Sequence, residues 1–276
     1  HRTTYRYLQQ VSFSQHLIHL EPRPTAVQNV LASQVRIDPW PARRMRRDDT
    51  IGNAAEWITI DDPHATLEIT AESRVVSTPM PYRDPAASRP WEDVRNLLAV
   101  ADDGNARAVV AFIFDSPHSG FASDVHLYSQ ESFTPRRPIL DAAIHLMGRI
   151  HRDFRYDTTV TDVTTPVDRV FEIRAGVCQD LAHVGIACLR SLGLAARYVS
   201  GYLLTRPPPG QEKMLGADAS HAWFSIWCPE FGWVDLDPTN DVLPGEGHVT
   251  AAWGRDYGDV APINGVVVGG GDHSID

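Results

Sequence analysis

The strongest constraint on the fold is a change of hydrophobic period at a proline-rich stretch. Before it, runs such as residues 65–76 carry β-branched residues at every second position, and Gly52 and Asn53 separate two such runs as a turn. This pattern is typical of antiparallel strands. Residues 77–91 then carry four prolines, which remove backbone donors and restrict their neighbours. We therefore expect a domain boundary there, with an N-terminal antiparallel β domain over residues 1–82.

Helices are expected next in the chain. Over residues 91–101 and 138–156, apolar residues recur three and four positions apart, as on one face of a helix. Alternating runs that predict strands return over residues 195–204 and 221–239 and again near the C-terminus. The pattern predicts an α+β protein whose second domain, residues 83–276, mixes helices and strands and includes the C-terminal segment.

Composition and charge narrow the functional classes. The 276 residues are 43% hydrophobic and 22% charged, which is ordinary for a globular protein with a sizeable core. No run of about 18 apolar residues is present and the N-terminal stretch is polar and aromatic, so we expect a soluble, cytoplasmic protein without a membrane partner. The net charge of −10 argues against nucleic-acid binding. The basic cluster at 42–49 is followed by acids and predicts a solvated loop or an ion-paired edge rather than a phosphate site.

The three cysteines are expected to be free thiols, neither joined in disulfides nor bound to a metal. Cys178, Cys188 and Cys228 are odd in number and lack metal-ligand spacing, so neither a disulfide framework nor a zinc site is indicated. No acidic loop has the spacing of a calcium site. We expect no metal and no cofactor. Cys188 lies on an apolar helical stripe and is expected to be buried, as is Cys228.

Cys178 differs from the other two because of its place on a helix. Apolar residues at helical spacing predict a helix over 178–192, and Gly193 can end it in the left-handed conformation. In the first turn, unpaired N–H groups and the helix dipole favour a thiolate or an oxyanion. The alternative is a small buried hydrophobic residue. Asp180 is expected to serve the helix N-terminus, whereas His183 points about 140° away from Cys178.

A hairpin supplies a base and a group to orient it. Residues 221–228 alternate as a strand, a turn follows near 229–232, and a second strand ends before Pro238. His221 and Asp237 therefore lie at the same open end of the hairpin. A carboxylate beside an imidazole fixes its tautomer and stabilises the imidazolium. Asp235 is the competing orienter, and Asp237 is preferred because the strand ends there.

Three motifs in this order, AGVCQDLAH, SHAWFSIW and FGWVDLDPT, resemble those of the transglutaminase-like superfamily. The segments beginning TYRYLQQVSFSQHL and GRDYGDVAPING are similar to the N-terminal β domain and the C-terminal segment of a bacterial cysteine protease subgroup. The resemblance implies a papain-like core with helices packed on an antiparallel sheet. It further implies Cys178 as nucleophile, His221 as general base and acid, and Asp237 as orienter. Ser225 stands where the family often has an acid.

The function implied by the resemblance is acyl transfer on an amide or peptide bond of a peptide or protein substrate, through a thioester. Hydrolysis is the expected outcome because water is always available. The alternatives are a transglutaminase with an amine acceptor, a non-catalytic peptide-binding member, and an assembly protein whose β domain recruits a peptide. The loop at 205–220 either shapes the substrate cleft or merely connects strands. Tyr156 lies near the cleft or in the core.

Overall fold

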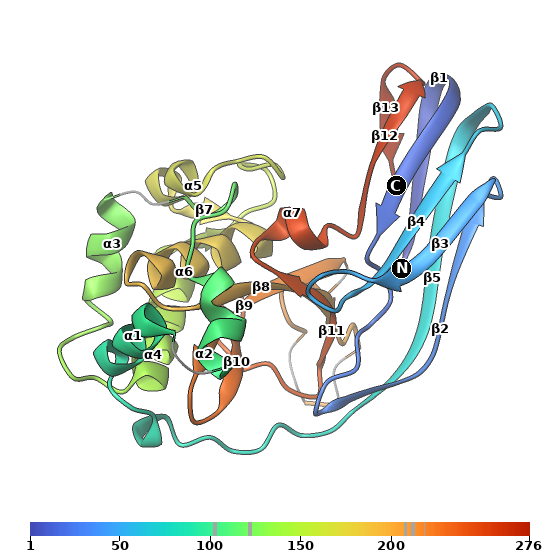
Figure 1. Ribbon diagram of the computed structural model, residues 1–276. Coiled ribbons are helices and arrows are strands. Elements are labelled where there is room, and N and C mark those ends of the chain that lie inside the picture. Colours follow the sequence, from blue (N-terminus) through green and yellow to red (C-terminus); the bar gives the residue numbers. More distant parts are fainter. Residues whose placement is uncertain (102–103, 121–122, 207–208, 211–212, 218) are drawn as a thin grey trace. The chain divides into compact units, whose positions relative to one another are not determined.

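The structure is a computed structural model that forms two compact units (Figure 1). It describes residues 1–101, 104–120, 123–206, 209–210, 213–217 and 219–276. The first unit comprises His1–Thr78, Val249–Ala252 and Val260–Asp276, and the second comprises Pro79–His248 and Trp253–Asp259. The expected α+β class is confirmed, because the first of these units is built on strands and the second combines helices with a sheet.

The first unit contains a curved antiparallel sheet in the order β2-β5-β1-β4-β3, to which β12 and β13 are added by pairing with β1. The strands are β1 (Arg2–Ile18), β2 (Gln28–Asp38), β3 (Arg43–Asp48), β4 (Ala54–Ile60), β5 (His64–Ser77), β12 (Ile263–Gly269) and β13 (His273–Ile275). The length of β1 allows its first part to pair with β5 and its last part with β4.

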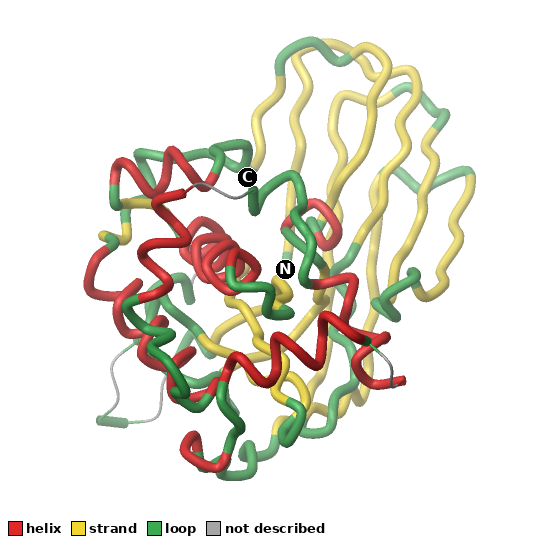
Figure 2. The backbone as a smooth tube through the Cα atoms, turned by 60° about the vertical axis from the view of Figure 1, so that its left-hand side comes forward, coloured by secondary structure: helices red, strands yellow, loops and turns green. Residues whose placement is uncertain are grey.

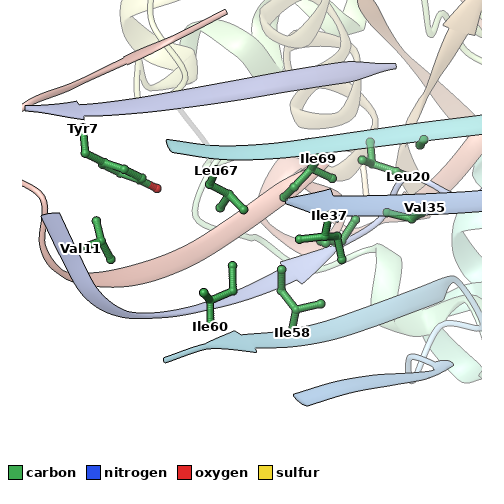
Figure 3. Packing of buried hydrophobic residues seen from close by; sticks show 11 residues of the cluster. Tyr7, Val11, Leu20, Val35, Ile37, Ile58, Ile60, Leu67 and Ile69 are labelled. Carbon is green, nitrogen blue, oxygen red and sulfur yellow. The ribbon is translucent and has the colours of Figure 1, made fainter. Parts of the chain in front are cut away.

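Alternate residues of these strands form the core of the first unit (Figure 3). Ile58 and Ile60 on β4 and Leu67 and Ile69 on β5 are buried, while their neighbours in the sequence are more exposed. Each such side chain contributes about 1.5–3 kcal/mol when it is fully buried. The period of two that is visible in the sequence therefore marks the buried face of the sheet.

The basic cluster forms β3, at one end of the strand order. Arg44 is ion-paired with Glu56, and Arg46 with Glu21. The prediction of an ion-paired edge is confirmed. Glu56 is buried in its pair, whereas the more exposed pair of Arg46 and Glu21 contributes little to stability.

The second unit carries nearly all of the helical residues and strands β10, β9 and β8 of a four-stranded sheet in the order β10-β9-β8-β11, while Val249–Ala252 of β11 are counted with the first unit. The α-helices are α1 (Trp91–Val100), α2 (Gly104–Val109), α3 (Ser123–Gln130), α4 (Ile139–Asp153), α5 (Val167–Ile173), α6 (Cys178–Ser191) and α7 (Tyr257–Val260). The strands are β6 (Arg155–Tyr156), β7 (Ala175–Gly176), β8 (Ala196–Leu203), β9 (Ser220–Cys228), β10 (Gly232–Leu236) and β11 (His248–Gly254). Two 3₁₀ turns are η1 (Pro85–Ala87) and η2 (Val110–Phe112).

Helix α6 is the buried centre of the second unit. It packs against β9 and β8 and touches α3, α4 and α5 (Figures 1 and 2). The contact with β9 requires Gly185, since a Cβ atom at this position would lie 2.5 Å from the ring of Phe224. Gly193 ends the helix with a φ of +76°, as the sequence predicts. Among the described residues, no helix is long and apolar enough to span a bilayer.

The C-terminal segment is placed differently from the expectation that residues 83–276 form one domain. Strand β12 pairs with β1, with His16 opposite Gly265, and β13 pairs with an earlier part of β1. Residues 260–276 consequently belong to the first unit. The physical reason is that antiparallel pairing joins strands from distant parts of a chain, so sequence order does not specify the partner.

Candidate active site

The first turn of α6 presents Cys178 at a capped helix terminus. Val177 is the N-cap residue and Cys178 the first residue of the helix. The Asp180 Oδ2 atom accepts hydrogen bonds from the Val177 N–H at 2.8 Å and the Thr161 hydroxyl at 2.6 Å. A Cβ atom on Gly176 would lie 2.5 Å from that oxygen, so the bend before the helix needs glycine. The predicted role of Asp180 at the helix terminus is confirmed.

Cys178 is the accessible cysteine of the three. Its side chain is partly exposed, whereas Cys188 and Cys228 are fully buried. Burial raises the pKa of both buried thiols to about 12, which keeps them protonated and unreactive. The three cysteines are free thiols. The predicted burial of Cys188 and Cys228 is confirmed.

The predicted hairpin brings His221 and Asp237 together. Strands β9 and β10 pair in antiparallel register, with Leu236 opposite Phe224, so the residue after Leu236 reaches the end of β9 where His221 lies. The His221 Nε2 atom is 2.9 Å from Asp237 Oδ2, and both side chains are fully buried. The prediction that His221 and Asp237 lie at the same end of the hairpin is therefore confirmed.

Asp237 is held by an unusually large number of donors. Its Oδ1 atom accepts from the backbone N–H groups of Thr239 and Asn240, at 3.0 and 3.3 Å. Its Oδ2 atom takes the Asn240 side-chain amide at 2.8 Å, and His248 Nε2 lies at 3.2 Å. Burial alone would raise the pKa of this carboxyl group, but the hydrogen bonds from His221, His248 and Asn240 hold it well below its usual range. Asp237 is thus a buried carboxylate.

His221 has the electrostatics of an imidazolium. Burial alone would lower its pKa, but the hydrogen bonds and charges of Asp237 and Cys178 raise the pKa to about 9. Because Asp237 occupies Nε2, the interaction with Cys178 falls on Nδ1. This atom is buried and has no hydrogen bond of ordinary geometry with the described residues. Such contacts are often loose without substrate and tighten when it binds.

Gly216 shapes the other side of the imidazole. It has a φ of +81°, and a Cβ atom there would lie 2.6 Å from His221 Nδ1. The neighbouring Leu215 donates its N–H to Asn240 Oδ1 at 2.8 Å, so the same asparagine contacts both Asp237 and this loop. Within the predicted loop at 205–220, residues 207–208, 211–212 and 218 lie outside the described residues.

Asp235, the competing orienter, lies elsewhere. It accepts a hydrogen bond from Ser225, its partner in the register of the hairpin, and Arg197 lies 4.0 Å away. The serine at the position where the family often has an acid therefore binds an acid from the next strand. Among the described residues Asp235 makes no hydrogen bond with His221, whereas the Asp237 carboxylate lies within hydrogen-bond distance of it.

His183 and Tyr156 are two further residues that the sequence brought into consideration for the site. His183 is buried, its Nε2 accepts from the Tyr257 N–H at 3.2 Å, and burial lowers its pKa to about 3, so it stays neutral and its Nε2 is already occupied. Tyr156 pairs with Gly176, two residues before Cys178. Burial raises the pKa of Tyr156, with a further contribution from Cys178, so this half-buried ring lies near the thiol rather than in the core.

His248 and Asn240 are the site residues that sequence reasoning missed. His248 is the first residue of β11, eleven positions after Asp237, and nothing in its spacing marks it as a partner of that carboxylate. Asn240 directly follows the Asp-Pro-Thr motif, and a turn-forming asparagine there was the available signal. Within the described part of the chain, no group of three or more His, Cys, Asp or Glu side chains is arranged to hold a metal ion.

Comparison with known proteins agrees with this geometry. Residues 128–238 match the transglutaminase-like superfamily, and residues 1–76 match the bacterial transglutaminase-like N-terminal region. An uncharacterized protein of Mycobacterium tuberculosis is 41% identical over 282 residues, covering 100% of this chain and 88% of that protein. A protein-glutamine gamma-glutamyltransferase of Pseudomonas aeruginosa is 35% identical over 99 residues, 34% of this chain and 14% of that enzyme.

The chain therefore belongs to the transglutaminase-like superfamily, with the bacterial N-terminal region of that group. Its fold is shared by a crystal structure from Cytophaga hutchinsonii described as a putative cysteine protease. The TM-score is 0.74 at 21% identity, covering 100% of this chain and 86% of that one. The resemblance seen in the three sequence motifs is thus confirmed at the level of family and fold.

Proposed function

We propose that the protein is a cysteine-dependent enzyme that hydrolyses an amide or peptide bond through a thioester, with Cys178, His221 and Asp237 as its catalytic residues. The observation that carries the proposal is the position of His221. Its Nε2 atom is 2.9 Å from the buried Asp237 carboxylate, and its other nitrogen is left to the thiol at the start of α6. This order of nucleophile, imidazole and carboxylate is the one that activates a thiol.

The chemistry follows from that order. The Cys178 thiolate attacks the carbonyl carbon of the substrate, and the Cys178 N–H at the helix terminus donates to the developing oxyanion. The His221 imidazolium then gives its proton to the departing amine as the C–N bond breaks, which leaves a thioester on Cys178. His221 next takes a proton from water, the hydroxyl adds to the thioester carbon, and the C–S bond breaks to release the acid. Asp237 keeps the imidazole oriented throughout.

An amine acceptor is the second candidate. The local similarity to the Pseudomonas aeruginosa protein-glutamine gamma-glutamyltransferase, 35% over 99 residues, supports it. In that case a primary amine replaces water in the second half of the reaction and an amide is formed instead of an acid. The triad serves both outcomes equally, so the acceptor has to be determined by experiment.

The test is mass spectrometry of a peptide library that contains glutamine and backbone amides, incubated with the wild-type protein and with Cys178→Ala, with and without a primary amine. Cleaved or deamidated peptides that disappear with Cys178→Ala are expected. Amine adducts that depend on Cys178 would instead establish the transglutaminase. Products that persist in Cys178→Ala would contradict both candidates.

Thiol alkylation supplies a control that needs no substrate. Iodoacetamide at neutral pH should modify Cys178 and spare Cys188 and Cys228, which are fully buried. His221→Gln should slow modification of Cys178 by about tenfold or more, because the thiolate loses its imidazolium partner. Equal rates in wild type and His221→Gln would show that the two side chains do not act as a pair.

A further inference from the structure

His248 is a buried histidine that the proposed mechanism does not use, although it touches the centre of the site. It begins β11, is 8% exposed, and places Nε2 3.2 Å from Asp237 Oδ2. This is the same oxygen that His221 Nε2 reaches at 2.9 Å. Two imidazoles from different strands therefore share one carboxylate oxygen.

The ionised state of Asp237 fixes the direction of its hydrogen bonds with His221 and His248. Asp237 is ionised, because its donors hold the pKa of this carboxyl group well below its usual range. An ionised carboxylate can only accept, so His221 and His248 must each donate an N–H from Nε2. Since the bonds use Nε2 of both rings, the tautomer of His248 is set by the structure.

The shared oxygen is crowded. Asp237 Oδ2 meets three donors, from Asn240, His221 and His248, while a carboxylate oxygen offers about two lone-pair directions. The donors therefore compete. Each one draws on the negative charge that would otherwise stabilise a proton on His221.

Packing holds the His248 ring in this position. The Trp223 side chain, which is fully buried, meets it edge to face with ring centroids 5.3 Å apart. The centroids of the His221 and His248 rings are 6.4 Å apart. Among the described residues, the titratable groups that face His221 are Cys178 from α6, Asp237 directly after β10 and His248 from β11.

We propose that His248 is a positioning residue of this site, which divides the Asp237 carboxylate between two imidazoles and so limits how strongly that carboxylate retains the proton on His221. This role rests on the proposed function, in which the imidazolium must release its proton to a leaving amine. A weaker hold on that proton makes His221 a better acid near neutral pH.

The test compares His248→Phe with His248→Gln. The phenylalanine keeps a ring against Trp223 and removes the donor, whereas the glutamine amide keeps a donor. Imidazole titration by ¹⁵N NMR should show the His221 midpoint raised by about half to one pH unit in His248→Phe, the range expected for the loss of one hydrogen bond. His248→Gln should restore most of the wild-type midpoint. His273→Phe, which changes an exposed histidine of β13, is the matched control and should leave the midpoint unchanged.

Turnover gives a second measurement. In His248→Phe, kcat for the Cys178-dependent reaction should fall about threefold with KM unchanged, because only proton release is affected. An unchanged or lowered His221 midpoint in His248→Phe would overturn the proposal. So would equal midpoints for the Phe and Gln variants, because the donor would then not be responsible.

The wild-type protein offers a test that needs no variant to fold. The ¹⁵N spectrum should show neutral His248 as the Nε2–H tautomer, and an Nδ1–H tautomer would overturn the proposal. These ring measurements do not depend on turnover. If wild-type protein gave no Cys178-dependent product, the proposed function would fail while the titration would still decide the role of His248.

Discussion

At the scale of single residues, the main energetic problem of the site is that the Asp237 carboxylate is buried in its charged form. A carboxylate with no exposure to water is costly unless it is paired and hydrogen-bonded. Asp237 meets that requirement through five donors, and His221 carries the compensating proton. The pairing on which the proposed mechanism depends therefore also couples protonation of His221 to folding.

This coupling predicts a pH dependence of stability. The pKa of His221 is about 9 in the folded protein and about 6.5 in an unfolded chain, so its contribution is complete below pH 6.5 and is lost as the pH rises through about 9. We expect the difference in unfolding free energy between wild type and His221→Gln to shrink by about 1–3 kcal/mol over that interval. Urea denaturation at several pH values measures it. A difference that stays constant with pH would show that the folded and unfolded pKa values of His221 are alike.

At the scale of elements, the start of α6 depends on one buried acid. The Asp180 carboxylate satisfies the Val177 N–H and the Thr161 hydroxyl and is 1% exposed. Asp180→Ala should lower the unfolding free energy by about 1–3 kcal/mol, because it leaves two partly buried donors without their acceptor. The rate of Cys178 alkylation should fall as the first turn of the helix loosens.

The control for this prediction is Asp168→Ala. Asp168 also lies in a first turn, that of α5, but its side chain is exposed. Its removal should change the unfolding free energy by no more than about 0.5 kcal/mol. Thermal unfolding of the wild type and of both variants measures these losses of unfolding free energy. Equal losses for the two would mean that Asp180 acts only through the helix dipole and not through its buried hydrogen bonds.

The elements also show what a sequence can and cannot predict. The helix that begins at Cys178 and the hairpin that joins His221 to Asp237 were predictable, because both depend on local periodicity and turn residues. His248 was not, because its partner is chosen by the pairing of strands that are distant in the sequence. The same limit explains why β12 could be expected as a strand without its partner, β1, being known.

At the scale of the whole molecule, the first unit is assembled from both ends of the chain. Residues 260–276 belong to this unit and contribute strand β12, which pairs with β1. Residues 249–252 belong to it as well. The Gln28 side chain, for instance, donates to the Thr250 carbonyl at 2.7 Å and accepts the Thr250 N–H at 2.8 Å. The first unit therefore cannot complete the hydrogen bonds of β1 before β12 and β13 are available.

This dependence can be tested at Gly265 of β12. A Cβ atom there would lie 2.4 Å from the Gln15 carbonyl oxygen and 2.4 Å from His16 Nδ1, so Gly265→Ala forces β12 away from β1. We expect a loss of about 1–3 kcal/mol, as for overpacked sites. Hydrogen exchange should accelerate in β1 and β12 but not in α6. Gly245→Ala is the matched control, because nothing lies within 4 Å of its added Cβ. Unchanged exchange in β1 of the Gly265→Ala protein would show that the first unit holds together without close pairing of its last strands.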